Sequence, residues 1–266
     1  MDVQALASGS SGNAYLVRSG SSAVLVDAGI SGRRLTAALE RAGLRPGDLL
    51  GILVSHEHAD HVRGAAQLAA TFQAPVVSTV GTFNASSLSA STPWISVRRS
   101  STISLGPFEV HTIPVQHDAE EPCAFRVSAD GVHVAIATDF GQPTDGLVEM
   151  IEDLDLLVLE SNHDEDWLWR GSYPWYLKKR VAGDHGHISN ETAAAMLVGL
   201  RERAPGSVWL AHLSKHNNSP KLALSTVQAA LRREGHRGRD VEVADRDHPS
   251  LRWTSAARVR QLVLGL

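Results

Sequence analysis

Short apolar runs rich in β-branched residues alternate along the chain with longer stretches in which Ala and Leu recur at helical spacing between Arg and Glu. The short runs predict strands at Val3–Ala7, Ala14–Val17, Ala23–Val26, Gly51–Ser55, Val76–Ser78, Glu109–Ile113, Ala124–Val127, Val132–Thr138, Leu154–Leu159, Val208–Ala211 and Val241–Ala244. The longer stretches predict helices at Gly32–Ala42, His61–Thr71, Thr144–Glu152, Asn190–Arg203 and Pro220–Glu234. This alternation is typical of an α/β fold.

The chain shows no internal division. No low-complexity linker, charge block or fixed-period repeat interrupts the 266 residues, and 43% of them are hydrophobic, so we expect one domain over residues 1–254. The Ser- and Thr-rich stretch Ser86–Ser104 predicts a polar loop with an edge strand. Residues 163–187 are expected to form an insertion rich in aromatic and basic side chains, and residues 255–266 a loosely held tail.

Composition narrows the functional classes. A net charge of -4 gives no global positive field, so any surface for nucleic acid has to be local. The start of the chain lacks a basic leader, and its apolar runs fall far below the ~18 residues of a membrane span. We therefore expect a cytoplasmic protein without membrane contact. The single cysteine, Cys123, excludes an internal disulfide and a thiolate metal cluster.

The densest chemistry lies directly after the apolar run Ile52–Val54, in the segment Ser-His-Glu-His-Ala-Asp-His. Its first two imidazoles, His56 and His58, are spaced to converge on one cation, while Asp60 and His61 face a second. Ionisable groups packed this tightly would repel or desolvate one another unless a cation satisfied them. The spacing therefore predicts two metal ions.

Three further features are compatible with a two-metal site, although each also has an ordinary structural explanation. The Gly/Ser segment Ser8–Gly12 follows a predicted strand and can offer backbone N–H groups to a phosphate, or it is an ordinary tight turn. Asp27 ends another strand, where it is placed to accept a hydrogen bond from a ligand histidine or simply to begin a turn. Glu160 also ends a strand, and His187 precedes a Ser189-capped helix whose amino terminus favours anions. A histidine with no part in turnover is the alternative for His187.

Aromatic and basic residues are concentrated between positions 167 and 180. Five aromatic and four cationic side chains gather there, in a chain that is only 5% aromatic. Bases stack on aromatic rings while Lys and Arg neutralise the phosphates, so the stretch is suited to one strand of DNA. Two alternatives stay open: a helical lid packed by its tryptophans, or a contact with a second copy of the chain in an oligomer.

The motif His-x-His-x-Asp-His resembles that of the metallo-β-lactamase superfamily. The resemblance implies a four-layer αββα sandwich, in which two mixed β-sheets are flanked by helices and the ligands stand on loops along one edge. It also implies that His56, His58 and His117 hold one metal ion, that Asp60, His61 and His212 hold the other, and that Asp139 bridges them. His117, Asp139 and His212 each stand just beyond the end of a predicted apolar strand.

The resemblance narrows to the YycJ/WalJ group, and it covers roughly residues 3–250. The matching segments include Leu6–Ala14, Val26–Gly29, Leu159–Asp164, Tyr173–Trp175, Gly186–Glu191 and His212–Asn218. Members of that group are similar to metal-dependent 5′-to-3′ DNA exonucleases. The matching segments imply substrate contacts at Ser8, Gly9, Ser10, Ser11, Gly12, Asn13, Asn162, Lys215, Asn217 and Asn218.

The sequence therefore predicts a dinuclear-metal phosphodiesterase, in which a metal-bound hydroxide cleaves DNA from a 5′ end. Asp60 would help to fix the hydroxide, and Glu160 would orient His187 beside the departing oxygen. Zinc or manganese suits the ligands, and iron is also compatible with them. Two alternatives remain: hydrolysis of a thioester, lactone or cyclic phosphodiester at the same centre, or a regulatory adaptor with structural metals.

Overall fold

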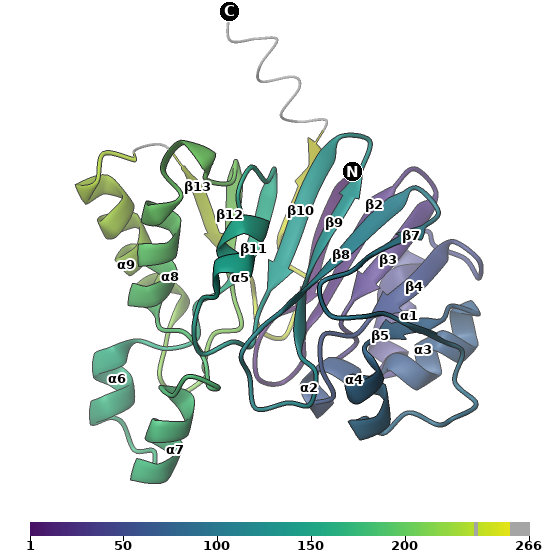
Figure 1. Cartoon of the computed structure of the whole chain (residues 1–266), viewed down its shortest axis with the longest axis horizontal. Helices are drawn as coiled ribbons and strands as arrows, with labels where there is room; N and C mark the ends of the chain where they lie inside the picture. The colour runs from purple at the N-terminus through teal and green to yellow at the C-terminus, as the bar shows by residue number, and fades with distance from the viewer. Residues whose placement is uncertain (237–238, 256–266) are drawn as a thin grey trace, which may run out of the picture.

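The structure is a computed structural model that describes residues 1–236 and 239–255. Two seven-stranded mixed sheets face each other (Figure 1). We call the first sheet A; its strand order is β14-β1-β2-β3-β4-β5-β6. Its strands are β1 (Asp2–Ala7), β2 (Ala14–Ser19), β3 (Ser22–Val26), β4 (Leu49–Leu53), β5 (Val76–Ser78), β6 (Trp94–Ser96) and β14 (Arg252–Thr254).

The second sheet, sheet B, repeats this plan with the order β13-β12-β11-β10-β9-β8-β7. In each sheet one half is antiparallel, and the other half, from β3 to β6 or from β10 to β13, is parallel. The strands of sheet B are β7 (Thr102–Leu105), β8 (Phe108–Pro114), β9 (Cys123–Ala129), β10 (Val132–Ala137), β11 (Leu156–Glu160), β12 (Ser207–Ala211) and β13 (Asp240–Val243).

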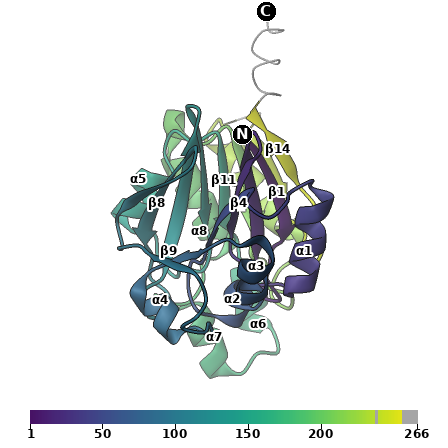
Figure 2. The same cartoon turned by 90° about the vertical axis from the view of Figure 1, so that its right-hand side faces the viewer.

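Helices cover the outer faces of both sheets, which gives four layers. Apolar side chains bury α1 (Gly32–Arg41) and α3 (Ala65–Phe72) against sheet A, the face turned to the viewer in Figure 2. On sheet B the same is true of α5 (Asp145–Met150), α8 (Asn190–Gly199) and α9 (Pro220–Arg233). Between the sheets lie the buried rings of Tyr15, Phe125 and Trp209. The predicted αββα sandwich is confirmed.

Two predicted helices differ from the observed ones. The helix predicted at His61–Thr71 is interrupted at Gly64, which separates α2 (Ala59–Val62) from α3. The reason is a close approach, because a Cβ on Gly64 would lie 2.4 Å from the carbonyl oxygen of Ile30. The helix predicted to reach Arg203 ends at Gly199 and continues as a short 3-10 turn at Arg201–Arg203.

Other elements fall where the sequence gives little periodicity. The stretch predicted as a polar loop with an edge strand contains β6 and the start of β7, and α4 (Val80–Ala85) precedes it. The aromatic and basic insertion folds into two short helices, α6 (Glu165–Arg170) and α7 (Trp175–Val181). Of the predicted tail, only Ser255 lies within the described residues, where its backbone N–H donates to the carbonyl of Met1 at 3.0 Å. None of the helices in the described residues combines the length and apolar composition needed to cross a membrane.

Candidate active site

The predicted ligands stand at the ends of strands in both sheets. The strand ends that precede them lie toward the lower side of Figure 1, where the short helices α2, α4, α6 and α7 also lie. Asp27, Asp139 and His212 follow β3, β10 and β12, and each has a positive φ, of 59°, 62° and 54°. This left-handed conformation is uncommon for residues other than glycine, and it turns the chain sharply as it leaves the strand. The strain, on the order of 1–3 kcal/mol per residue, is typical of functional sites.

The first group of ligands consists of His56, His58 and His117, whose candidate ligand atoms all lie within 4.8 Å of one another. His56 and His58 follow β4 in sheet A, whereas His117 follows β8 in sheet B. The Nδ1 atom of His117 lies 3.1 Å from the carbonyl oxygen of Gly186, which leaves its Nε2 atom facing the group. These are the residues that the resemblance assigned to one metal ion.

The second group consists of Asp60, His61 and His212, and it meets the same distance criterion. It too joins the sheets, because the first two residues lie in α2 beside sheet A and His212 follows β12 of sheet B. Asp139 lies between the groups, with Oδ2 3.2 Å from Nε2 of His61 and Oδ1 3.8 Å from Nε2 of His117. The structure therefore brings together all of the predicted ligands.

Two imidazole nitrogens in this cluster lack hydrogen-bond partners among the described residues. Nε2 of His56 and Nε2 of His212 are both buried, one in each group. A buried polar atom without a partner is costly, and a cation would satisfy both nitrogens. Imidazole and carboxylate donors without a thiolate fit zinc, manganese or iron.

A buried carboxylate supports each histidine of the second group. Nδ1 of His61 lies 2.8 Å from Asp27, and Nδ1 of His212 lies 2.8 Å from Glu160. Burial opposes protonation, but the charges of Asp139 and Asp27 raise the pKa of His61 well above its usual value. The pKa of His212 is raised to about 10, because the charge of Asp139 and the contacts with Asp60 and Glu160 outweigh burial.

The first group behaves in the opposite way. Burial, together with the neighbouring charge of His61, lowers the pKa of His56 well below its usual value. Burial also lowers the pKa of His117, although the charge of Asp139 opposes it. A cation therefore meets neutral imidazoles at His56 and His117, whereas it must displace protons from His61 and His212.

The site carboxylates are ionised despite burial. His212 and His61 lower the pKa of Asp139 well below its usual value, because their charges outweigh the penalty of burial. The pKa of Asp60 is also lowered, since its contact with His212 and the charge of His61 overcome desolvation. A negatively charged centre of this kind favours the binding of two divalent cations.

Glu160 connects the ligand cluster to His187. Its Oε1 atom lies 2.9 Å from Nδ1 of His187 and 2.8 Å from Nδ1 of His212. Burial opposes ionisation of Glu160, but these two histidines lower its pKa. The Glu160 side chain is fully buried, whereas that of His187 is 22% exposed and lines a cavity of about 170 Å³. An oriented imidazole at the mouth of a metal site can exchange a proton with a substrate.

The Gly/Ser loop contacts two of the predicted ligands. Asn13 closes the loop, because its Oδ1 atom accepts from the backbone N–H of Gly9 at 3.0 Å and its amide nitrogen lies 3.1 Å from Nε2 of His61. The hydroxyl of Ser8 accepts a hydrogen bond from the backbone N–H of His212 at 2.9 Å. Gly12 is buried, and within the loop only Ser10 and Ser11 are exposed. A phosphate role for the loop stays a prediction.

The predicted substrate-binding residues Asn162, Asn217 and Asn218 are buried and form hydrogen bonds within the protein. The Asn162 amide donates to the carbonyl of His212 at 2.9 Å, although Asn162 also lines the cavity beside His187. Asn218 donates to the carbonyl of Ser161 at 2.9 Å, and Asn217 is 2% exposed. Their substrate contacts stay predictions. The remaining residue of this set, Lys215, is exposed.

Two contacts at the site were not predicted from the sequence. Asp118 directly follows His117, and its Oδ1 atom lies 3.2 Å from Nε2 of that histidine. Its other oxygen accepts from Nε of Arg180 on α7 at 2.7 Å. The carboxylate next to a ligand was a visible signal, but its ion pair depends on the path of the insertion. The second miss is the sharing of Glu160 between two histidines.

An αββα sandwich with this cluster along one edge of both sheets defines a metallohydrolase of the β-lactamase type. A family model described as "Beta-lactamase superfamily domain" matches residues 22–213. The chain belongs to the beta-lactamase superfamily, and it is a metal-dependent hydrolase, as the sequence predicted.

The chain is similar to two curated relatives and to one solved structure. It is 37% identical to exodeoxyribonuclease YycJ of Bacillus anthracis, over 91% of this chain and 94% of the relative. It is 34% identical to exodeoxyribonuclease WalJ of Streptococcus pneumoniae strain D39, over 84% of this chain and 85% of the relative. The metallo-beta-lactamase fold protein YhfI of Bacillus subtilis shares the fold, with a TM-score of 0.71, 19% identity and coverage of 95% of this chain and 98% of that one.

Proposed function

We propose that the protein is a 5′-to-3′ exodeoxyribonuclease that works with two divalent metal ions, either zinc or manganese, with iron also compatible. The first ion is assigned to the group of His56, the second to the group of His61, and Asp139 is shared. The observation that carries the proposal is the contact between Glu160 and His187, which sets an oriented proton donor beside the ligand cluster. The exodeoxyribonuclease names of both curated relatives support DNA as the substrate.

The chemistry divides between the ions and the side chains. When bound, the ions supply positive charge that acidifies water and neutralises the phosphoryl oxygens. Asp60, with a side chain 22% exposed, accepts a hydrogen bond from the attacking water. The attacking water gives a proton to the Asp60 carboxylate and adds to the phosphorus, the bond between the phosphorus and the leaving oxygen breaks, and the His187 imidazolium donates its Nε2 proton to that oxygen. Glu160 keeps the His187 imidazole in the orientation that this transfer needs.

A substrate panel tests the proposal. End-labelled single- and double-stranded DNA, RNA, a cyclic nucleotide and a thioester are each incubated with the zinc- or manganese-loaded protein. We expect shortening of DNA from its 5′ end. The substitution His187→Ala should slow this reaction by about 10²–10⁴-fold, the usual worth of a positioned acid.

The matched control is His185→Ala, which removes an exposed imidazole two positions away. This control should retain wild-type activity. Turnover of the thioester or cyclic nucleotide with no DNA cleavage would instead assign the centre to small-molecule hydrolysis. DNA cleavage that survives both chelation and Asp60→Ala would contradict the metal mechanism.

A further inference from the structure

Three buried polar side chains, one of them next to Glu160 in the chain, form a hydrogen-bonded network. Ser161 and Asn190 are fully buried, and Asn218 is 5% exposed. The amide nitrogen of Asn190 donates to Oδ1 of Asn218 at 3.1 Å, and the amide nitrogen of Asn218 donates back to Oδ1 of Asn190 at 2.8 Å. The hydroxyl of Ser161 also donates to Oδ1 of Asn190, at 2.6 Å. We call Ser161, Asn190 and Asn218 the amide network.

The amide network joins the three segments that carry the shared carboxylate and its two histidines. Its serine directly follows Glu160 at the end of β11. Its first asparagine, Asn190, begins α8 and lies three positions after His187. Its second asparagine, Asn218, lies in the loop between β12 and α9, which starts at His212. The network therefore stands where the three segments meet.

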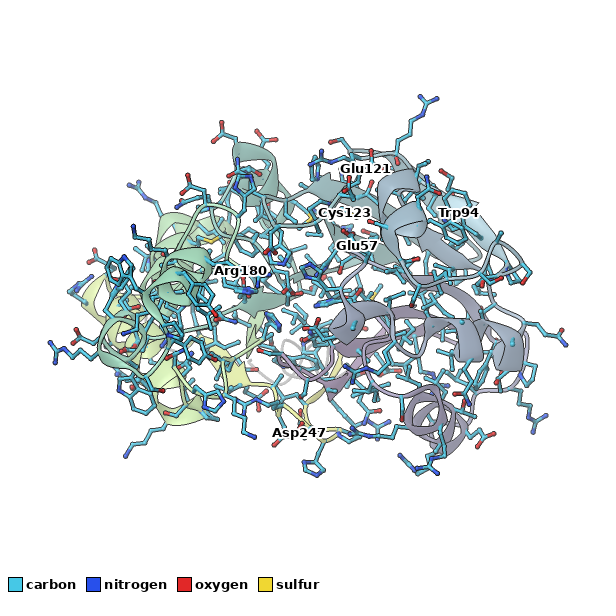
Figure 3. The ribbon with its side chains drawn as sticks, turned by 90° about the horizontal axis from the view of Figure 1, so that it is seen from below. Glu57, Trp94, Glu121, Cys123, Arg180 and Asp247 are labelled. Carbon is cyan, nitrogen blue, oxygen red and sulfur yellow. The ribbon has the colours of Figure 1, made fainter. Side chains whose placement is uncertain are left out.

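These segments all belong to the half of the molecule built on sheet B. Helices α8 and α9 lie side by side against that sheet in Figure 1. Seen from below in Figure 3, the helices coloured green to yellow lie on one side with Arg180, whereas Glu57 of the loop after β4 lies on the other. The network thus acts within the half that supplies both His187 and its carboxylate partner.

Backbone hydrogen bonds connect the amide network to the site. The N–H of Asn162 donates to the carbonyl of Ile188 at 3.0 Å, and the N–H of Asn190 donates to the carbonyl of His163 at 2.8 Å. The Asn218 amide also donates to the carbonyl of Asn162 at 3.1 Å. The segment that precedes α8 is thereby aligned with the end of β11.

Both carboxylate oxygens of Glu160 are engaged. Its Oε1 atom is shared by His187 and His212, at 2.9 Å and 2.8 Å. Its Oε2 atom accepts hydrogen bonds from the backbone N–H of Phe140 at 3.1 Å and from that of Ile188 at 3.4 Å. Glu160 cannot follow a shift of His187 without losing one of these bonds. The contact between the two side chains therefore depends on the alignment of the segments that carry them.

We propose that the amide network positions the His187 imidazole for proton transfer, because it aligns the segments on either side of Glu160. This inference rests on the proposed function and adds the residues that keep its proton donor in place. Apolar side chains of the same size would fill this volume without fixing an orientation, whereas hydrogen bonds are directional. A buried polar network with satisfied members holds one arrangement of the segments that it joins. Ser161, Asn190 and Asn218 are therefore positioning residues.

Two substrates distinguish a misplaced proton donor from general damage to the centre. The alkoxide that leaves DNA needs a proton, whereas p-nitrophenolate leaves thymidine 5′-(p-nitrophenyl phosphate) without one. With the manganese-saturated protein, Asn190→Ala should lower kcat for DNA by about 10- to 100-fold at unchanged KM. Its kcat for the p-nitrophenyl ester should stay within about threefold of the wild-type value.

The other members of the network give graded versions of the same test. Asn218→Ala should repeat the pattern of Asn190→Ala. Ser161→Ala leaves the pair of amides intact, so it should lower kcat for DNA by only about 2- to 10-fold, with no loss on the ester. If either asparagine variant fails to fold, Ser161→Ala carries the test.

A double-mutant cycle gives a second measurement on DNA alone. In a protein that already carries His187→Ala, Asn190→Ala should lower activity by no more than about twofold, because the donor that it positions is absent. Thr112→Val is the matched control, since it removes a fully buried hydroxyl that donates to the carbonyl of Arg98 at 2.7 Å, outside the ligand cluster. This control should leave both activities unchanged. Circular dichroism and elemental analysis establish the fold and metal content of each variant.

Three results would overturn the inference. The first is an equal loss of activity on DNA and on the p-nitrophenyl ester, which would assign the network to the stability of the whole centre. The second is a full further loss from Asn190→Ala in the His187→Ala background. In either case, wild-type DNA cleavage that depends on His187 would leave the proposed function intact. The third is a wild-type protein that does not cleave DNA, and this result would remove both proposals.

Discussion

The two groups of metal ligands differ in what stands behind them. Each histidine of the second group is backed by a carboxylate, since His61 contacts Asp27 and His212 contacts Glu160. Both carboxylates are fully buried, and each lies at the Nδ1 atom of its histidine, whose Nε2 atom lies 3.7 Å from Asp60. An anionic partner makes the opposite ring nitrogen a stronger donor to a cation.

In the first group, the Nδ1 atoms of His56 and His117 have neutral partners instead, and the one nearby carboxylate outside the ligand set, Asp118, lies on the Nε2 side of His117. Nδ1 of His56 lies 3.0 Å from the hydroxyl of Ser55, and Nδ1 of His117 lies 3.1 Å from the carbonyl of Gly186. Neutral oxygens orient these rings without adding charge. We therefore expect the second position to bind its ion more tightly once His61 and His212 have lost their protons, and the first to depend more on the shared carboxylate of Asp139.

The largest expected effect comes from removing that shared carboxylate. Asp139→Ala should reduce DNA cleavage by about 10³-fold or more, because both positions lose their common anion. Elemental analysis should show that both ions are weakened, with the first lost more readily. The control is Asp166→Ala, which removes an exposed carboxylate from α6. A variant that kept both ions and full activity would contradict the role of Asp139.

Exchanging Asp27 or Glu160 for the corresponding amide tests directly whether a charged partner of the histidine strengthens metal binding at the second position. Asp27→Asn should weaken metal binding at the second position by about 10- to 100-fold and leave the first position occupied. Glu160→Gln should weaken the same position comparably but reduce cleavage further, since Glu160 also holds His187. Competition with a chelator measures both affinities. Equal losses at the two positions would remove the proposed difference between the groups.

A smaller loss of metal affinity is expected when the neutral hydroxyl that contacts His56 is removed. The hydroxyl of Ser55 lies 3.0 Å from His56 and 3.1 Å from Asp27. Ser55→Ala should cost about 1 kcal/mol, equivalent to roughly fivefold in metal affinity. Ser128→Ala is a suitable comparison, because that hydroxyl contacts His133 at 2.8 Å, outside the ligand cluster. An effect as large as that of Asp27→Asn would mean that neutral support matters as much as charge.

The smallest effect concerns Cys123, which lies behind the first group and donates its backbone N–H to the carbonyl of Ser55 at 3.1 Å. Burial raises the pKa of its thiol to about 12, so no anionic sulfur supports this group. The folded protein should therefore react negligibly with Ellman's reagent at pH 8, whereas the denatured protein should release one equivalent. Rapid labelling of the folded protein would show that an ionised thiol is accessible there.

Much of the site was predictable because a strand end fixes where a residue goes. His56, Asp139 and His212 each follow a buried apolar run, so strand periodicity and residue type together place them at one edge. Asp27 was placed by the same logic, and its contact with His61 is present. The four-layer architecture followed from the family motif, which carries information that periodicity alone does not.

The features that were not predicted depend on contacts between residues distant in the chain, which local sequence patterns do not encode. The interruption at Gly64 arises from the backbone of Ile30, distant in the chain. The contact of Glu160 with His212 requires two strands to lie side by side, and β11 and β12 do so in parallel. The three-residue strands at Trp94–Ser96 and Arg252–Thr254 are too short for an alternating signal.

Both ligand groups draw histidines from the two sheets, and this arrangement has a consequence for how the molecule is assembled. In the group of His56 and in the group of His61, ligands come from both the amino-terminal and the carboxy-terminal portion of the chain. If these residues are the ligands, we expect ions to bind only after the two sheets have come together. An ion bound at either group would then link the two sheets, and separating the sheets would require the loss of that ion.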